Sequence, residues 1–306
     1  MTRGLIAALV IEVIALAMLL TTAADQIAHT RVEKLGGVNV WGYRGPVLHQ
    51  KKGNEVRISV TGGDLAFGWG VTAAETTAPS LRDLVRMRLD LPGHALRLYT
   101  GVTAGARGLA PVDYASWIDR YAYLRPDVIC VVPDPAGHVL GDSGFLPDRR
   151  SAAFAAFGYS PILPLVLQEK GTFAHSALLR LAGNALAAAD AAVGRRMGAP
   201  GAAIAGGADY EASIAAAVRA GQRSSTAGVV VVLSPANETS RVKERLSTTF
   251  ARERLRIVDL GEDPRMRDPG LRLDGFSFSA GGHAAAAEII APAVLALLGD
   301  AERRTP

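Results

Sequence analysis

Apolar stretches of two kinds alternate along the chain after residue 55. Short continuous apolar runs, typical of strands buried on both faces, lie near residues 56–61, 95–99, 125–133, 228–233 and 255–260. Stretches with helical apolar spacing, or rich in alanine, lie at residues 80–90, 111–123, 175–194, 208–222, 238–251 and 281–298. Because strands alternate with helices, the pattern predicts an α/β fold, a three-layer domain with a doubly wound parallel sheet.

The first apolar run differs from the others and predicts a membrane segment. Residues 4–24 are apolar except for Glu12 and two threonines, and about 20 such residues span a bilayer. Arg3 precedes the run, so the alternative is a cleaved signal peptide ending near Ala24. We favour an uncleaved N-terminal transmembrane helix, since the run exceeds a usual signal-peptide core. Either interpretation places the following domain on the extracytoplasmic side, in the periplasm or outside the cell.

Glu12 lies in the middle of the predicted span. An ionisable group there is unfavourable and usually faces a protein partner. Glu12 therefore suggests a membrane-protein partner or self-association, and a protonated, tolerated glutamate is the alternative.

The pattern divides the chain into four parts. Residues 1–24 are the anchor or signal peptide, and residues 25–55 are a juxtamembrane linker and an extended strap. Residues 56–299 form the α/β domain, and residues 300–306 are a charged tail. Within the domain, residues 134–175 are expected to be a long irregular insertion, which packs as a lid or lies against a membrane or a partner. No internal repeat or second domain is evident.

Composition excludes several classes of function. A chain of 306 residues with 49% hydrophobic and 20% charged residues is long enough for a large core and is not typical of disorder. The net charge is only +4 and no basic block is present, which argues against nucleic-acid binding. Cys130 is the single cysteine, so there is no disulfide framework, and no Cys/His spacing suggests zinc. No cofactor is expected.

The turn after the first strand is the place where chemistry is expected. In open α/β sheets, ligands bind beyond the carboxyl ends of the strands, and the glycine-rich segment 57–70 occupies that place. It resembles the first motif of the SGNH (GDSL-type) hydrolases, in which a strand ends in Gly-Asp-Ser. Gly63 and Asp64 match this motif, whereas Leu65 stands at the position of the nucleophilic serine. Leucine has no hydroxyl or thiol, so no acyl-enzyme can form there.

Two further sequence motifs of the family have counterparts at corresponding positions in this chain, but with altered residues. The resemblance implies a glycine whose N–H helps to bind the oxyanion, and Gly105 or Gly101 stands near that position. It also implies an asparagine at the end of a later strand, where this chain has Asp134. The preceding strap at residues 39–46 is similar to the Asn-x-x-Gly-x-Arg-Gly lead of bacterial SGNH proteins.

The last block resembles the family's Asp-x-x-His segment. Asp274 matches the orienting acid, whereas Ser277 stands at the position of the catalytic histidine. His283 matches a histidine at the start of the last helix, which is structural in the family. The resemblance covers residues 39–298 in the correct block order, and it implies an SGNH/flavodoxin-like fold.

Nucleophile, base and asparagine are absent together, which indicates a degenerate site with Asp274 as its remnant. We therefore expect a pocket formed by Asp64, Leu65, Gly105, Asp134 and Ser277 in a membrane-anchored pseudo-esterase. The resemblance implies binding of an acylated glycan or lipid, or support of a membrane partner, in cell-envelope metabolism. The alternatives are an active esterase or acyltransferase with a non-standard site, and a purely structural protein.

Other polar residues allow different sites. His138 and Ser143 could supply a base and a nucleophile beside Asp274, or His283 could replace the base. Three carboxylates at one sheet edge, those of Asp64, Asp134 and Asp274, could hold a hard cation. We prefer the interpretation that Asp64 and Asp274 accept hydrogen bonds from backbone groups of their own turns, and we predict no metal.

Overall fold

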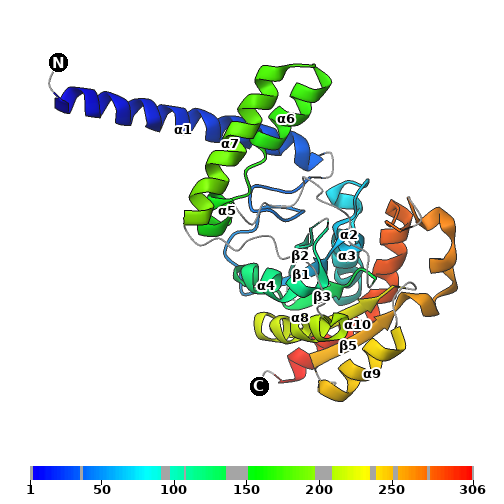
Figure 1. The fold of residues 1–306 in the computed structure, drawn as a ribbon. Coiled ribbons are helices and arrows are strands. Elements are labelled where there is room, and N and C mark those ends of the chain that lie inside the picture. Colours follow the sequence, from blue (N-terminus) through cyan, green and yellow to red (C-terminus); the bar gives the residue numbers. More distant parts are fainter. Residues whose placement is uncertain are drawn as a thin grey trace. The chain divides into compact units, whose positions relative to one another are not determined.

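The computed structural model describes residues 3–34, 37–90, 97–106, 108–135, 151–196, 209–234, 239–250, 254–273 and 276–304 (Figure 1). The chain divides into two compact units. The anchor unit comprises residues 1–34, 39–41 and 147–202, and the sheet unit comprises residues 35–38, 42–146 and 203–306.

Five parallel strands form the centre of the sheet unit. They are β1 (Glu55–Gly62), β2 (Leu98–Thr103), β3 (Val128–Val132), β4 (Gly228–Leu233) and β5 (Leu255–Asp259). Their order is β2-β1-β3-β4-β5, and every neighbouring pair is parallel. This is the flavodoxin-like order of a doubly wound sheet, and it confirms the predicted fold class. The order changes direction between β1 and β3, where such folds place their ligands.

Helices cover both faces of this sheet (Figure 1). On one face lie α3 (Thr77–Leu89) and α10 (Ala280–Arg304), which contact each other and the strands. On the other face lie α4 (Tyr114–Arg120) and α8 (Tyr210–Ser224), and α9 (Thr239–Thr249) contacts α8. The short helix α2 (Asp64–Phe67) follows β1 directly.

The alternation of side chains along β1 explains the two layers. Val56, Ile58 and Val60 belong to one continuous buried core with residues of α3 and α10. The intervening Arg57 and Ser59 point to the other face, since successive side chains of a strand alternate. Arg57 is buried there and donates a hydrogen bond to the carbonyl of Leu124 at 2.8 Å.

The second strand extends beyond the predicted run near residues 95–99. β2 continues through Gly101 and pairs it with Ile58. A Cβ at Gly101 would lie 2.2 Å from the carbonyl oxygen of Ala78. The glycine therefore allows α3 to pack closely on β2.

The anchor unit begins with α1 (Arg3–Lys34). The segment Gly4–His29 of this helix is long and apolar enough to cross a membrane, with a mean hydropathy of 2.5 in an 18-residue window, and the same segment is compatible with a signal sequence. Residues 25–34, expected as linker, continue the helix. Helix α10 is also long and apolar, but it packs against the sheet.

The expectation of an irregular insertion at residues 134–175 is wrong for two segments. Helices α5 (Ala152–Phe157) and α6 (Leu163–Phe173) form there, followed by α7 (Ala177–Arg196). Ser151 caps α5 by accepting the N–H of Phe154, and Pro164 lies in the first turn of α6, where its missing N–H is tolerated. Pro164 thus marks the start of a helix and not an irregular loop.

Asp25 joins α1 to the start of α6. Its buried carboxylate accepts the N–H groups of Ile162 at 2.8 Å and Leu163 at 2.5 Å, and it also accepts the hydroxyl of Tyr159. One turn further along α1, Nε2 of His29 lies 2.6 Å from the carbonyl oxygen of Ser160. Two successive turns of α1 therefore bind the segment that leads into α6.

We predict that Asp25→Ala weakens the junction between α1 and α6. The substitution leaves two N–H groups without their acceptor, which costs about 1–3 kcal/mol for each buried group. Hydrogen exchange at Ile162 and Leu163 should accelerate in detergent micelles. The exposed Ile27→Ala is the matched control, and equal exchange in both variants would contradict the capping role.

Candidate functional site

The turn from β1 into α2 brings three chain segments into close contact. A Cβ at Gly62 would lie 2.0 Å from the carbonyl oxygen of Val132, and a Cβ at Gly63 would lie 2.0 Å from Oδ2 of Asp134. Gly105 also packs here, because its Cβ would lie 2.8 Å from the carbonyl oxygen of Gly62. Any larger residue at these positions would separate the ends of β1, β2 and β3.

The carboxylate of Asp134 binds the first turn of α2. It accepts the N–H of Asp64 at 2.8 Å and the N–H of Leu65 at 3.0 Å. Four of the five predicted pocket residues, Asp64, Leu65, Gly105 and Asp134, are thus brought together at the carboxyl edge of the sheet.

Two tyrosines hold the backbone around this carboxylate. The hydroxyl oxygen of Tyr114 accepts the N–H groups of Gly63 and Asp134, both at 3.2 Å. The hydroxyl of Tyr210 donates to the carbonyl of Asp134 at 2.8 Å. Burial, with the nearby Asp134 charge as a second cause, raises the pKa of both phenols, so they stay protonated at neutral pH.

Burial raises the pKa of Asp134 to about 7. The N–H groups of Leu65 and Asp64 lower it and offset part of this shift, whereas the nearby charge of Asp64 raises it further. Asp134 therefore exchanges its proton near neutral pH.

Leu65 is a core residue. Its side chain is 1% exposed and belongs to the same buried cluster as Val60 and Val132. Its N–H group, which a serine hydrolase would direct at an oxyanion, already donates to Asp134. The described part of this turn therefore offers neither a nucleophile at position 65 nor an uncommitted donor there.

Arg44 fixes the other end of α2. Nη1 donates to the carbonyl oxygens of Phe67 and Gly68 at 2.5 and 2.6 Å, and Nη2 donates to that of Val71 at 2.5 Å. The guanidinium also lies over the ring of Phe67, 4.9 Å from its centroid. Burial lowers the pKa of Arg44 to about 10, which leaves it charged at neutral pH. Its role was not predicted, and the only sequence signal was an arginine within the Gly-rich strap.

His283 packs against this turn at Gly68. Its Nδ1 lies 2.9 Å from the hydroxyl of Thr77, and Nε2 would lie 2.7 Å from a Cβ at Gly68. Burial lowers its pKa to about 3, with the charge of Arg44 as a further cause, so the ring is neutral. A fully buried, neutral ring fits the structural role implied by the family resemblance.

The loop before α10 carries the remaining predicted residues. Ser277 is buried, and its carbonyl oxygen accepts the N–H of Leu273 at 2.9 Å. The loop approaches the first turn, because a Cβ at Gly70 would lie 2.8 Å from Cδ1 of Leu273. Asp274 lies outside the described residues, as do His138 and Ser143. Within the described ranges, no group of three or more His, Cys, Asp and Glu side chains is arranged to hold a metal.

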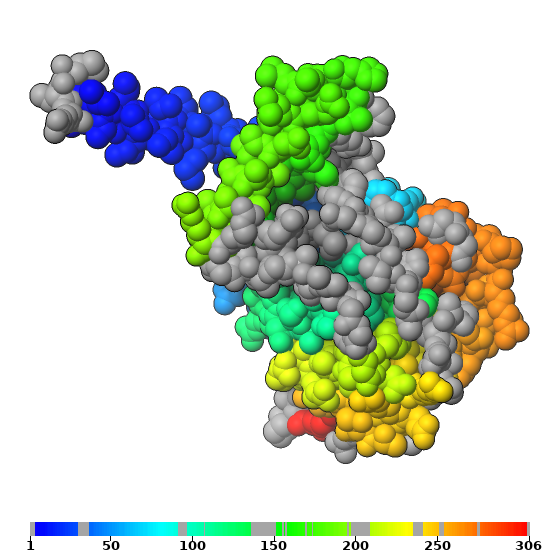
Figure 2. Space-filling view, viewed as in Figure 1, coloured from blue at the N-terminus to red at the C-terminus, as the bar shows by residue number. Residues whose placement is uncertain are grey.

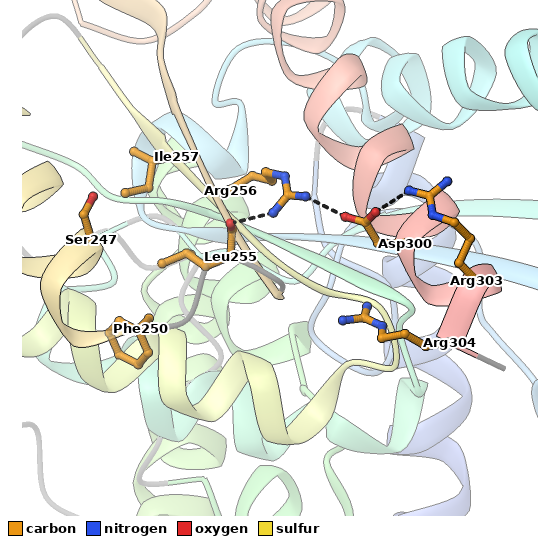
Figure 3. Close-up of a pocket in the computed structure, with 8 residues that line it drawn as sticks. All are labelled: Ser247, Phe250, Leu255, Arg256, Ile257, Asp300, Arg303 and Arg304. Carbon is orange, nitrogen blue, oxygen red and sulfur yellow. Dashed lines mark hydrogen bonds and ion pairs between the residues drawn. The ribbon is translucent and has the colours of Figure 1, made fainter.

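A groove of about 790 Å³ lies elsewhere, at the amino end of β5 (Figure 3). Phe250 lines one side, and Arg256 and Arg303 both pair with Asp300. The Arg256–Asp300 distance is 2.6 Å. Because ligands of such folds bind at the carboxyl ends of the strands, this groove is not the expected site.

Comparison with solved structures finds distant esterases. They include a family 3 carbohydrate esterase from Talaromyces cellulolyticus, with 13% identity and a TM-score of 0.41 over 80% of this chain and 99% of that one. A protein assigned to the G-D-S-L lipolytic family of Desulfitobacterium hafniense has 11% identity and a TM-score of 0.39 over 78% and 98%. A family 3 carbohydrate esterase of Clostridium thermocellum has 14% sequence identity and a TM-score of 0.38, over 80% of this chain and 98% of that one. No protein-family model and no curated protein sequence matches the chain. At such identities and TM-scores the likeness carries no conclusion about the chemistry of this chain.

We predict that Asp134→Asn changes how stability depends on pH. Folded Asp134 keeps a proton that the unfolded chain loses between about pH 4 and 7, so its contribution to stability falls as pH rises through this window. His283 acts oppositely, because the unfolded chain binds its proton below about pH 6.5 and the folded protein does not above about pH 3. Between about pH 4 and 6.5, the fall in stability due to Asp134 and the rise due to His283 offset each other.

Without the Asp134 carboxyl group, the rise of the unfolding free energy with pH that is due to His283 is no longer offset. The unfolding free energy of Asp134→Asn should therefore rise more steeply from pH 4.5 to 6.5 than that of the wild type, by up to about 1.4 kcal/mol per pH unit. Urea titrations followed by the fluorescence of the buried Trp117 measure this slope. Asp119→Asn, at an exposed pair with Arg223, is the matched control. A slope in Asp134→Asn equal to that of the wild type would contradict a raised pKa of Asp134.

Proposed function

We propose that this protein is a membrane-anchored SGNH-like pseudo-esterase that works by binding or assembly and not by hydrolysis. One observation carries the proposal: the residue at the nucleophile position, Leu65, is buried in the core, and its N–H donates to Asp134. Both the attacking atom and a donor for the oxyanion are therefore replaced by structural contacts.

The comparison with a working serine hydrolase supports this proposal. Such an enzyme needs a nucleophile, a base that takes its proton, an acid that orients the base, and donors for the developing oxyanion. Here leucine replaces the nucleophile, Ser277 stands at the position of the base, and Asp134 accepts hydrogen bonds where the family's asparagine donates one. Among the described residues, His283 packs against this turn, and its ring is neutral and bonded to Thr77.

The anchor gives the setting of the proposed function. The exposed apolar side chains of α1 continue from Leu5 to Leu20, which fits insertion in a bilayer. With α1 as an uncleaved anchor, the sheet unit works at the extracytoplasmic face of a membrane. Acylated glycans or lipids of the cell envelope are the ligand class that fits both the setting and the family resemblance.

We predict that the purified chain does not turn over short-chain acyl esters and resists covalent labelling by a fluorophosphonate probe. The physical reason is the absence of an activated hydroxyl at position 65. Labelling is measured by intact mass, with an active serine esterase as the positive control. Stoichiometric labelling that is lost in Ser143→Ala would contradict the proposal and favour an active esterase with a rebuilt site.

We also predict that Glu12 faces another membrane helix. A charged carboxyl at mid-bilayer costs about 2.5–3.5 kcal/mol on insertion scales, and a hydrogen bond to a neighbouring helix lowers that cost. Glu12→Leu should leave membrane insertion intact while reducing co-purification of a partner or the size of the detergent-solubilised assembly. Glu12→Gln, which keeps hydrogen bonding, is the control. Unchanged size and partners in Glu12→Leu would show that Glu12 has no assembly role.

A further inference from the structure

Helix α7 packs on α6 through one of its faces. Gly183 is buried in this contact, where a Cβ would lie 2.6 Å from the carbonyl oxygen of Pro164. At the edge of the contact, Nε2 of Gln168 donates a hydrogen bond to Oδ1 of Asn184 at 2.9 Å. The two helices thus form an α6–α7 hairpin within the anchor unit.

A second face of α7 is apolar and exposed. Leu178, Leu181 and Val193 are 76%, 66% and 50% exposed. The alanines between them on the same face are also exposed, namely Ala182, Ala185, Ala188 and Ala189. Spacings of three and four residues place all seven side chains on one stripe of the helix, the lipid stripe. Arg180 and Asn184 lie beside it, at the edge of the contact with α6.

The junction at Asp25 sets the depth of this hairpin relative to α1. Asp25 follows the predicted span of residues 4–24 directly, and it accepts the N–H groups that open α6. His29 adds a second contact one turn later. The start of α6 is therefore held where α1 would leave the hydrocarbon of a bilayer. Helix α6 contacts α1 and α7 packs on α6, so the hairpin is held near this end of α1 (Figure 1, Figure 2).

We propose that α7 lies in the interface of the membrane that α1 spans, with the lipid stripe against the acyl chains. An apolar helix face with polar residues beside it, held parallel to the surface, is the arrangement of interfacial helices. Continuity with the anchor favours lipid over a protein partner, because the same unit already contains the span. The inference rests on the proposed anchoring of α1.

Fluorescence quenching in vesicles tests this placement. Single cysteines at Leu178, Leu181 and Ala185 are labelled with a small fluorophore in the full chain, and Arg180→Cys and Asn184→Cys serve as matched controls one or three residues away. The native Cys130 does not compete, because it is buried and burial raises its pKa to about 12. The labelled proteins are reconstituted in phosphatidylcholine vesicles with nitroxides placed near the headgroup or near the end of the acyl chain.

The expected result is an approximately twofold loss of fluorescence at the three stripe positions with the shallow nitroxide, and little loss at the two controls. Leu16→Cys, in the middle of the span, reports on the anchor separately and should be quenched by the deep nitroxide. Quenching at position 16 without quenching on the stripe would overturn the inference and leave the anchor intact. Absence of quenching at position 16 would overturn the anchor, and the inference with it. Cross-linking between stripe positions of two copies, without lipid quenching, would replace lipid by a second copy.

Discussion

The carboxyl edge of the sheet depends on one contact. The N–H groups of Asp64 and Leu65 both donate hydrogen bonds to the carboxylate of Asp134. They join the turn after β1 to the end of β3, at the place where the strand order reverses. The approach is possible only because Gly62 and Gly63 have no side chains. A charged acceptor strengthens each bond to about 1.5–3 kcal/mol, and burial opposes this by favouring the protonated form. The pKa near 7 expresses that balance.

The same contact is the basis of the proposal that this protein binds a ligand and does not hydrolyse it. In a serine hydrolase the first turn after this strand presents a hydroxyl and an N–H to the substrate, so both must be uncommitted. Here Leu65 contributes its side chain to the core and its N–H to Asp134. Arg44 on the far end of α2 and His283 beneath it hold the turn in place. The side chain and the N–H group of Leu65 thus both serve the fold.

Patterns confined to one segment were predictable, and contacts between distant segments were not. The apolar run at residues 228–233 corresponds to β4 residue by residue, because a strand buried on both faces needs a continuous apolar run. The closeness of Asp64 and Asp134 followed from parallel strands sharing one edge. The clamp made by Arg44 and the strand position of Gly101 depend on tertiary approach, which no local spacing encodes.

The helix starts show this limit most clearly. Gly63 before α2 and Ile162 before α6 provide no side-chain cap, so the local sequence does not supply the acceptor that usually caps a helix start. In both cases a buried aspartate from elsewhere supplies the acceptor: Asp134, about 70 residues away, for α2, and Asp25, 137 residues away, for α6. Each cap therefore forms only when its unit folds, and each makes a helix conditional on tertiary structure. That dependence is why the start of α6, which lacks a local side-chain cap, was predicted to be irregular and yet is helical in the structure.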